Sequence, residues 1–201
     1  MNRETDSRFP VRPTVIAHEL GGGLLGEGAA AIDATAGNGH DTVWLAGKVG
    51  ETGRVLAFDI QAEAIGAARR RVEAAGWLGR VVFYLESHVG MDSYAPPGSV
   101  SLVMFNLGYL PGGDHGLTTT PEATLTALDA ATRVLRSGGG LSVVCYPGHP
   151  AGAVEAEAVG AWFERIAAAG WRVSRHGPEG TLRPAPFLLF AEKPVSYGSA
   201  V

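Results

Sequence analysis

The stretch from Asp33 to Thr42, Asp-Ala-Thr-Ala-Gly-Asn-Gly-His-Asp-Thr, constrains the fold of this chain more than any other feature. It follows an apolar run of strand length and precedes an apolar helical pattern, so it is typical of a strand, a glycine turn and a helix in succession. Gly37 and Gly39 permit a positive φ and a close approach of the backbone to a ligand, and Asp41 and Thr42 are expected to cap the helix. Exposed amide groups at such a helix start bind polar ligands. We therefore predict a ligand-binding turn here.

A second signal lies about 20 residues further on, the spacing of nucleotide-binding folds. Residues 54–59 have the pattern of a strand that ends in Asp59, the usual position of a carboxylate that binds ribose hydroxyls. The glycine spacing fits neither a dinucleotide fingerprint nor a P-loop, and no Lys or Arg lies between Gly37 and Gly47, which argues against a pyrophosphate. The acidic Asp33 suits a positively charged ligand. S-adenosylmethionine carries an ammonium and a sulfonium but no phosphate, so we expect it as the cofactor; the alternative is a turn whose glycines serve packing only.

Strand and helix patterns alternate along the chain, which predicts an α/β fold with helices on both faces of a mainly parallel sheet. Strands are expected at residues 29–34, 54–59, 81–85, 101–105, 141–146, 171–174 and 187–191, and helices at 13–26, 41–49, 61–75, 121–136 and 152–169, with a loop at 92–98. The last two strands are separated by prolines and turn residues, so we expect an antiparallel hairpin. This order matches the class I, Rossmann-like sheet of S-adenosylmethionine-dependent methyltransferases, as a single domain over residues 1–201 with residues 1–12 and 196–201 flexible.

Composition excludes several other classes of protein. A net charge of −4 and a pI near 5.8 give no general attraction to nucleic acid, so an RNA contact would need a local basic patch. Residues 69–71, three consecutive arginines, are the densest candidate, although such a cluster is also typical of a solvated helix face. Cys145 lies in an apolar strand and is expected to be a buried thiol. We see no signal peptide, membrane-spanning run or metal-ligand spacing, and expect a cytoplasmic protein without membrane or metal.

The segment after the fourth strand, Asn106 to His115, is the second informative feature. Ligands of doubly wound sheets bind beyond the carboxyl ends of the strands, so this segment is expected to face the substrate. Amine-methylating enzymes carry Asp/Asn-Pro-Pro-Tyr/Phe at this place, and residues 106–109 resemble that tetrapeptide without its prolines. An Asn oxygen can accept the hydrogens of a neutral amine and aim its lone pair, and Tyr109 could stack on a nucleobase. The alternative is a glycine-rich surface loop.

The candidate site residues fall into three groups. The catalytic candidates are Asn106, Tyr109 and Asp114. The cofactor-binding candidates are Asp33, Thr35, Gly37, Asn38, Gly39, Asp41, Thr42, Asp59, Gln61, Ser87, His88 and Asn106. The substrate-binding candidates are Leu107, Gly108, Pro111, Gly112, Gly113, His115, His149 and Arg183. His88 and His149 could equally be structural, and the Asp114 carboxylate would also favour the unreactive ammonium form of an amine.

On these residues the chain resembles the YtqB/MnmM-type methyltransferases, which are often labelled rRNA methylases. The matching words lie at 17–20, 32–42, 58–61, 87–88, 105–114, 118–120 and 148–150. The resemblance implies methyl transfer from S-adenosylmethionine to the aminomethyl nitrogen of 5-aminomethyl-2-thiouridine, or its relative, at the wobble position of tRNA. It also implies that the anticodon region of tRNA is the partner, and that the protein is a homodimer. The chain departs from the family pattern at Val89, at Pro147 and over 183–187, which bears on substrate positioning.

Other functions stay open at this point. A methyltransferase of a small-molecule amine, which the acidic pI favours, or of rRNA would use the same cofactor. A cofactor-binding scaffold that stabilises an RNA-modifying partner would need no catalytic Asn106.

Overall fold

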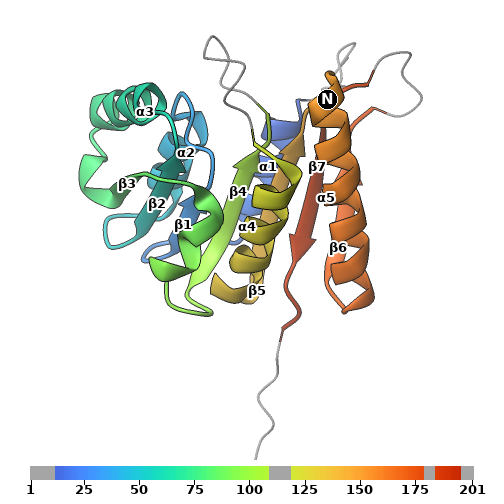
Figure 1. The fold of residues 1–201 in the computed structure, drawn as a ribbon. Coiled ribbons are helices and arrows are strands. Elements are labelled where there is room, and N and C mark those ends of the chain that lie inside the picture. Colours follow the sequence, from blue (N-terminus) through green and yellow to red (C-terminus); the bar gives the residue numbers. More distant parts are fainter. Residues whose placement is uncertain (1–11, 109–118, 179–183, 196–201) are drawn as a thin grey trace, which may run out of the picture.

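The computed structural model describes residues 12–108, 119–178 and 184–195, and over these residues the chain forms one seven-stranded sheet (Figure 1). The strands are β1 (Ala30–Asp33), β2 (Arg54–Asp59), β3 (Val81–Leu85), β4 (Val100–Asn106), β5 (Leu135–Cys145), β6 (Arg172–His176) and β7 (Phe187–Glu192). Their order is β3-β2-β1-β4-β5-β7-β6; the first five pair in parallel, and β7 is antiparallel to both β5 and β6. The predicted sheet and its closing antiparallel pair are confirmed. The tails predicted to be flexible lie outside the described residues, except for Arg12.

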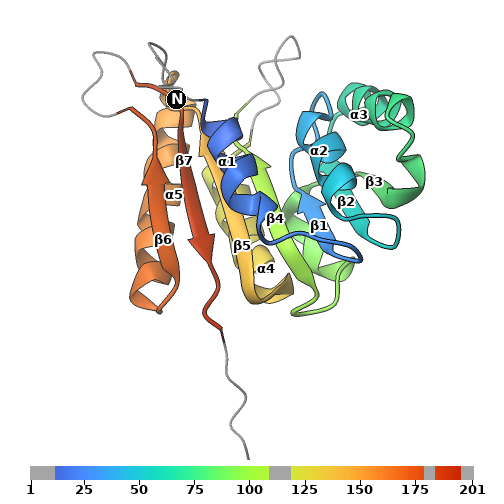
Figure 2. The same cartoon turned by 180° about the vertical axis from the view of Figure 1, so that it is seen from behind.

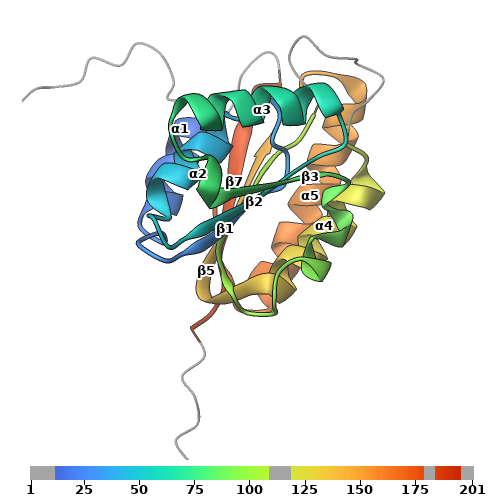
Figure 3. The same ribbon diagram turned by 90° about the vertical axis from the view of Figure 1, so that its left-hand side faces the viewer.

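Helices cover both faces of the sheet. They are α1 (Pro13–Gly22), α2 (His40–Lys48), α3 (Ala62–Ala74), α4 (Pro121–Val134) and α5 (Pro150–Ala168), with 3-10 helices η1 (Leu78–Arg80) and η2 (His88–Ser93). Figure 1 shows α4 and α5 in front of the sheet, and Figure 2 shows α1 and α2 on its other face. Seen edge-on in Figure 3, the sheet separates these two layers. Because both faces are covered, β4 is buried along almost its whole length and is nearly continuous in apolar residues.

Four predicted boundaries are wrong: the end of α4, the start of β5, the end of α1 and the start of the loop at 92–98. The fourth long helix ends at Val134 and β5 begins at once, because Leu135 pairs with Val100 before the register shifts and Gly140 pairs with Leu102. Gly138, Gly139 and Gly140 lie at this irregularity, where Gly138 has a φ of 68°. Helix α1 ends at residue 22 rather than 26, and the loop predicted at 92–98 begins inside η2.

The topology brings three polar residues to one edge of the sheet. Asp33, Asp59 and Asn106 are the last residues of β1, β2 and β4, and β1 lies between the other two strands. The carboxyl ends of these three strands lie together at the top of the sheet in Figure 1. This edge is where a doubly wound sheet binds its ligands.

Candidate functional site

The turn after β1 is held in shape by backbone contacts that require its glycines. The amide of Gly37 donates to Asp59 Oδ2 at 2.9 Å, and Gly37 has a φ of 49°. Gly39 is the N-cap of α2 with a φ of 78°, and a Cβ placed there would lie 2.5 Å from Ala68 Cα of α3. From α3, Arg71 Nε donates to the carbonyl of Asn38 at 2.7 Å, so one of the three consecutive arginines supports the turn itself.

The predicted capping of α2 by Asp41 and Thr42 is wrong. The N-cap is Gly39, which offers no side-chain acceptor to the first-turn amides. Thr42 is fully buried, and its hydroxyl donates to Asp33 Oδ2 at 2.5 Å. The start of α2 therefore has no side-chain cap, and its first-turn amides keep the partial positive charge of a helix start.

Asp33 supports the turn from inside the protein. Its side chain is fully buried, and Oδ1 accepts from the amide of Thr35 at 3.2 Å while Oδ2 accepts from Thr42. Burial, and secondly the charge of Asp41, raises the pKa of Asp33 to about 7. The expectation that Asp33 and Thr42 touch the cofactor is therefore corrected: both are enclosed by protein and hold the turn. Asp59, by contrast, is half-buried, and its Oδ1 accepts from the amide of Gln61 at 3.0 Å.

Asn106 is tied to both neighbouring segments. Its backbone amide donates to Thr35 Oγ1 at 2.7 Å, and its side-chain Nδ2 donates to Asp41 Oδ2 at 2.6 Å. Asp41 Oδ1 accepts from Nε2 of His18, a residue of α1, at 2.7 Å. The His18 ring stacks on Trp44 of α2, with centroids 4.1 Å apart and planes 3° apart. His18 is not among the site residues that the sequence predicts, because no spacing links α1 to the turn.

The residues after β3 are mainly structural. Ser87 accepts from the amide of Val89 and thereby caps η2. His88 is 8% exposed, its Nδ1 donates to the carbonyl of Ala34 at 2.9 Å, and its ring meets Phe105 edge-on. Burial lowers the pKa of His88, which favours the neutral ring. Of the two roles open for His88, these contacts support the structural one.

The residues directly after Asn106 are held by hydrogen bonds to β5 and, through Thr119, to α5. Leu107 is 2% exposed inside the apolar core, and its amide continues the sheet by donating to the carbonyl of Val144. Its predicted contact with substrate is therefore corrected to a packing role. The amide of Gly108 donates to Thr119 Oγ1 at 3.2 Å, and that hydroxyl donates to Glu155 Oε2 at 2.8 Å. Glu155 of α5 is 3% exposed and was not singled out, although a carboxylate on an apolar helix face is the signal that marks it.

Several candidates have other neighbours or lie outside the description. His149 is the N-cap of α5 and accepts from the amide of Gly152 through Nδ1, which supports its anchoring role. Cys145 is buried, as expected, and burial raises its pKa to about 12. The predicted site residues that lie outside the described residues are Tyr109, Pro111, Gly112, Gly113, Asp114, His115 and Arg183.

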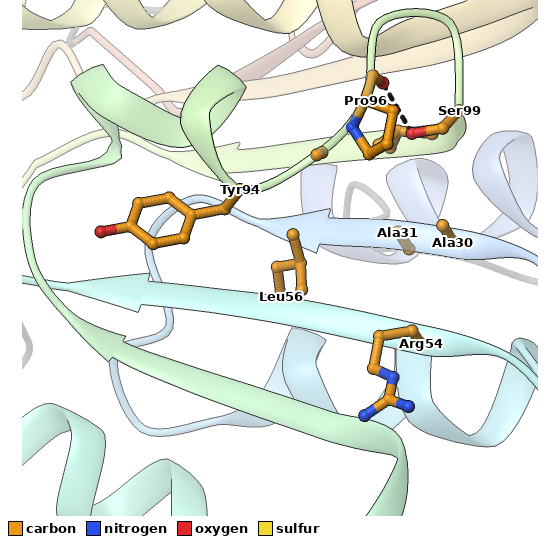
Figure 4. Close-up of a pocket in the computed structure, with 9 residues that line it drawn as sticks. Ala30, Ala31, Arg54, Leu56, Tyr94, Pro96 and Ser99 are labelled. Atoms are coloured by element: carbon orange, nitrogen blue, oxygen red, sulfur yellow. Dashed lines mark hydrogen bonds between the residues drawn. The ribbon is translucent and has the colours of Figure 1, made fainter.

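A separate pocket of about 160 Å³ lies at the opposite end of the strands (Figure 4). It is lined by Ala30 and Arg54, the first residues of β1 and β2, together with Leu56, Tyr94 and other residues. It is therefore distinct from the turn and Asn106. Within the described ranges, no group of three or more His, Cys, Asp or Glu side chains is arranged to hold a metal. None of the helices described combines the length and apolarity needed to cross a membrane.

Comparison with known proteins gives a consistent result. Residues 55–192 match the family model described as “Putative rRNA methylase”. A tRNA (mnm(5)s(2)U34)-methyltransferase, chloroplastic, of Arabidopsis thaliana is 37% identical over 90% of this chain and 69% of its own length. The crystal structure of a “putative rRNA-methylase” from Clostridium thermocellum has a TM-score of 0.86 and 38% identity, and covers 90% of this chain and 97% of that one.

A “putative methyltransferase” from Streptococcus mutans, solved in complex with SAH, has a TM-score of 0.82 and 31% identity, and covers 92% of this chain and 99% of that one. These likenesses, together with the order of the strands, confirm the predicted class I methyltransferase fold. The chain belongs to the rRNA methylase family.

Proposed function

We propose that this protein transfers a methyl group from S-adenosylmethionine to the aminomethyl nitrogen of 5-aminomethyl-2-thiouridine, or its 2-oxo relative, at the wobble position of tRNA. The name of the Arabidopsis relative, tRNA (mnm(5)s(2)U34)-methyltransferase, contains the methylated form of this nucleoside, at U34. RNA is the substrate class in both that name and the family description. The turn and Asn106 supply the residue types that such a reaction needs.

The turn fits S-adenosylmethionine, which would supply the methyl group on a sulfonium. The start of α2 has no side-chain cap and suits a carboxylate, while Gly37, which is half-buried and has a positive φ, lets a ligand approach the backbone. Asp59 is half-buried, and each of its oxygens keeps a second lone pair beyond its bond to Gly37 or Gln61, so it can accept from ribose hydroxyls. We keep Thr35, Asn38 and Gln61 as cofactor contacts.

The observation that carries the proposal is the fixed position of Asn106. It ends β4 beside the glycine turn, and both its backbone and its side chain are held there by hydrogen bonds. A neutral amine must attack the methyl group in line, and orientation of this kind supplies roughly 7–11 kcal/mol in favourable cases. The carboxamide oxygen of Asn106 would accept an amine hydrogen and set that direction. We keep Tyr109 and Asp114 as partners of Asn106 in this step.

We also propose that the anticodon region of tRNA binds at this edge of the sheet, that the enzyme is a cytoplasmic homodimer, and that no metal takes part. Arg183 and the segment 108–115 are the proposed contacts to the nucleoside.

The test is transfer of labelled methyl from S-adenosylmethionine to tRNA whose wobble uridine carries the unmethylated aminomethyl group, followed by nucleoside mass analysis. We expect a gain of one methyl on that nucleoside and none on tRNA with unmodified uridine. Separate reactions contain rRNA and a small primary amine. Labelling of either in place of tRNA would reject the tRNA assignment, and cofactor binding without transfer to any of them would favour the scaffold function.

A further inference from the structure

The side chain of Asn106 has two different ends, and only one of them can serve an amine. Its oxygen accepts hydrogen bonds and its nitrogen donates them. The nitrogen lies 2.6 Å from Asp41 Oδ2, and a carboxylate oxygen can only accept, so the chemistry of Asp41 decides which end faces it. Among the described residues, no donor is bonded to the Asn106 oxygen.

Asp41 is itself fixed from its other side. Asp41 is 7% exposed, and its second carboxylate oxygen, Oδ1, accepts from His18 Nε2 at 2.7 Å. His18 keeps its place by stacking on Trp44, which stands on the same helix as Asp41. Each oxygen of the Asp41 carboxylate therefore accepts from one donor. If either donor were replaced by an acceptor, that hydrogen bond would be lost.

We infer that Asp41 and His18 are positioning residues that orient the Asn106 carboxamide, with its nitrogen toward Asp41 and its oxygen toward the amine that receives the methyl group. This inference rests on the proposed function for its consequence in turnover, but the orientation itself is a property of the protein alone. It gives α1, which precedes the first strand, a part in the reaction.

An Asp41→Asn variant tests the orientation directly. While His18 Nε2 remains the donor, the new side chain turns its oxygen to His18 and its NH₂ group to residue 106, so the Asn106 carboxamide turns over to accept from it. The donor end of Asn106 then faces the amine. We expect kcat to fall by about 100-fold, the cost typical of misplacing a catalytic group, while the dissociation constant of S-adenosylhomocysteine changes less than about threefold.

A reciprocal exchange provides the matched control. An Asn106→Asp variant sets two carboxylates against each other and should be as impaired as the Asp41→Asn variant. In the double variant the Asn at 41 accepts from His18 and donates to the Asp at 106, whose second oxygen faces the amine. We expect it to regain at least about tenfold in kcat over Asn106→Asp. Turnover is compared at alkaline pH, because a carboxylate stabilises the unreactive ammonium form.

His18 is tested with two substitutions that differ in one property. His18→Phe keeps the stacking on Trp44 and removes the donor, whereas His18→Gln keeps a donor and loses the ring. We expect the Gln variant to retain more of kcat than the Phe variant, with melting temperatures measured alongside. Equal kcat in the two variants, or a loss that follows melting temperature alone, would overturn the role of His18.

Nuclear magnetic resonance separates this inference from the proposed function. The chain has three asparagines, Asn2, Asn38 and Asn106, so ¹⁵N-asparagine labelling gives three side-chain NH₂ pairs in the parent and four in Asp41→Asn. Adding Asn106→Ala to each protein removes, and so assigns, the pair of residue 106. We expect the Asn106 pair to exchange slowly with solvent and to shift strongly in Asp41→Asn, whatever substrate the enzyme uses. A rapidly exchanging pair, or one that Asp41→Asn leaves in place, would overturn the inference even if tRNA is methylated. The expected spectra without tRNA methylation would reject the proposed function alone.

Discussion

At the scale of residues, the site is built by carboxylates that bind other parts of the protein. Asp33 binds Thr35 and Thr42, and Asp41 binds Asn106. Asp59 accepts from the backbone amides of Gly37 and Gln61. These bonds are made in a partly buried setting, where an unpaired donor or acceptor is costly. The polar groups at the strand ends are therefore fixed before any ligand arrives.

Replacement of Asn106 by Ala is predicted to separate turnover from cofactor binding. The Ala variant keeps the backbone bond to Thr35 but has no carboxamide, so methyl transfer should fall by at least about 100-fold. Calorimetry with S-adenosylhomocysteine should give a dissociation constant close to that of the parent protein. If cofactor binding disappears together with turnover, Asn106 belongs to the cofactor side of the site.

Asp33 should make stability depend on pH. Its folded pKa of about 7 lies above its ordinary value of 3.8, so the folded chain holds this proton more tightly than the unfolded chain does. The resulting stabilisation is complete below about pH 4 and is lost as the pH rises to about 7, with a slope of up to about 1.4 kcal/mol per pH unit.

The Asp33→Asn substitution removes the carboxyl group that binds this proton. Urea unfolding across that range should therefore show a flatter pH dependence for Asp33→Asn than for the parent, whereas Glu157→Gln, at an exposed carboxylate, should follow the parent. Parallel curves for the parent and Asp33→Asn would contradict a raised pKa.

At the scale of elements, the approach of α2 to α3 depends on Gly39. A Gly39→Ala variant must adopt a positive φ and also place its Cβ 2.5 Å from Ala68 Cα. Gly76 has nearly the same φ, 77°, but nothing lies within 4 Å of a Cβ there, so Gly76→Ala carries the backbone strain alone.

Strain of this kind costs roughly 1–2 kcal/mol. We expect Gly39→Ala to lower the free energy of unfolding by at least about 1 kcal/mol more than Gly76→Ala, and to weaken cofactor binding, which Gly76→Ala should not. Chemical denaturation measures the first effect and calorimetry the second. Equal costs for the two variants would mean that α3 moves away freely.

The hydroxyl of Thr119 connects Gly108, which follows β4, with Glu155 of α5. A Thr119→Val variant keeps the shape but removes the acceptor of the Gly108 amide and a donor to the buried Glu155, so we expect a loss of about 1–3 kcal/mol in unfolding free energy. Thr126→Val is the control, since its hydroxyl is exposed and bonds only within α4. Methyl transfer should fall in the first variant at a temperature where both are folded.

The sequence predicts the strands and the glycine turn because their patterns involve residues that are close together in the chain. Alternating apolar runs place every strand, and the glycine turn with Asp59 marks the cofactor edge, because strand periodicity and positive φ are properties of neighbouring residues. The start of β5 is missed because Leu135 pairs with Val100, a contact that helix propensity does not report. His18 and Glu155 are missed for the same reason: their partners, Asp41 and Thr119, lie on other elements.

At the scale of the whole molecule, the association state is a prediction that no contact within one chain can decide. We expect light scattering after size exclusion to give twice the 20.8 kDa mass of the chain. A monomer that methylates tRNA at full rate would show that one chain completes the RNA site.

Helix α1 precedes β1 in the chain but packs against β5 and β7, which come much later in the sequence. Its contacts reach β5 and β7, and it carries His18 to Asp41. During synthesis on the ribosome, the part of this docking surface that β5 and β7 supply is complete only after residues up to 192 have emerged, and contacts of such long sequence separation form slowly. A nascent chain that has folded only β1 to β4 thus lacks the β5 and β7 contacts of α1, so the position of His18 beside Asp41 is then supported by fewer contacts than in the folded protein.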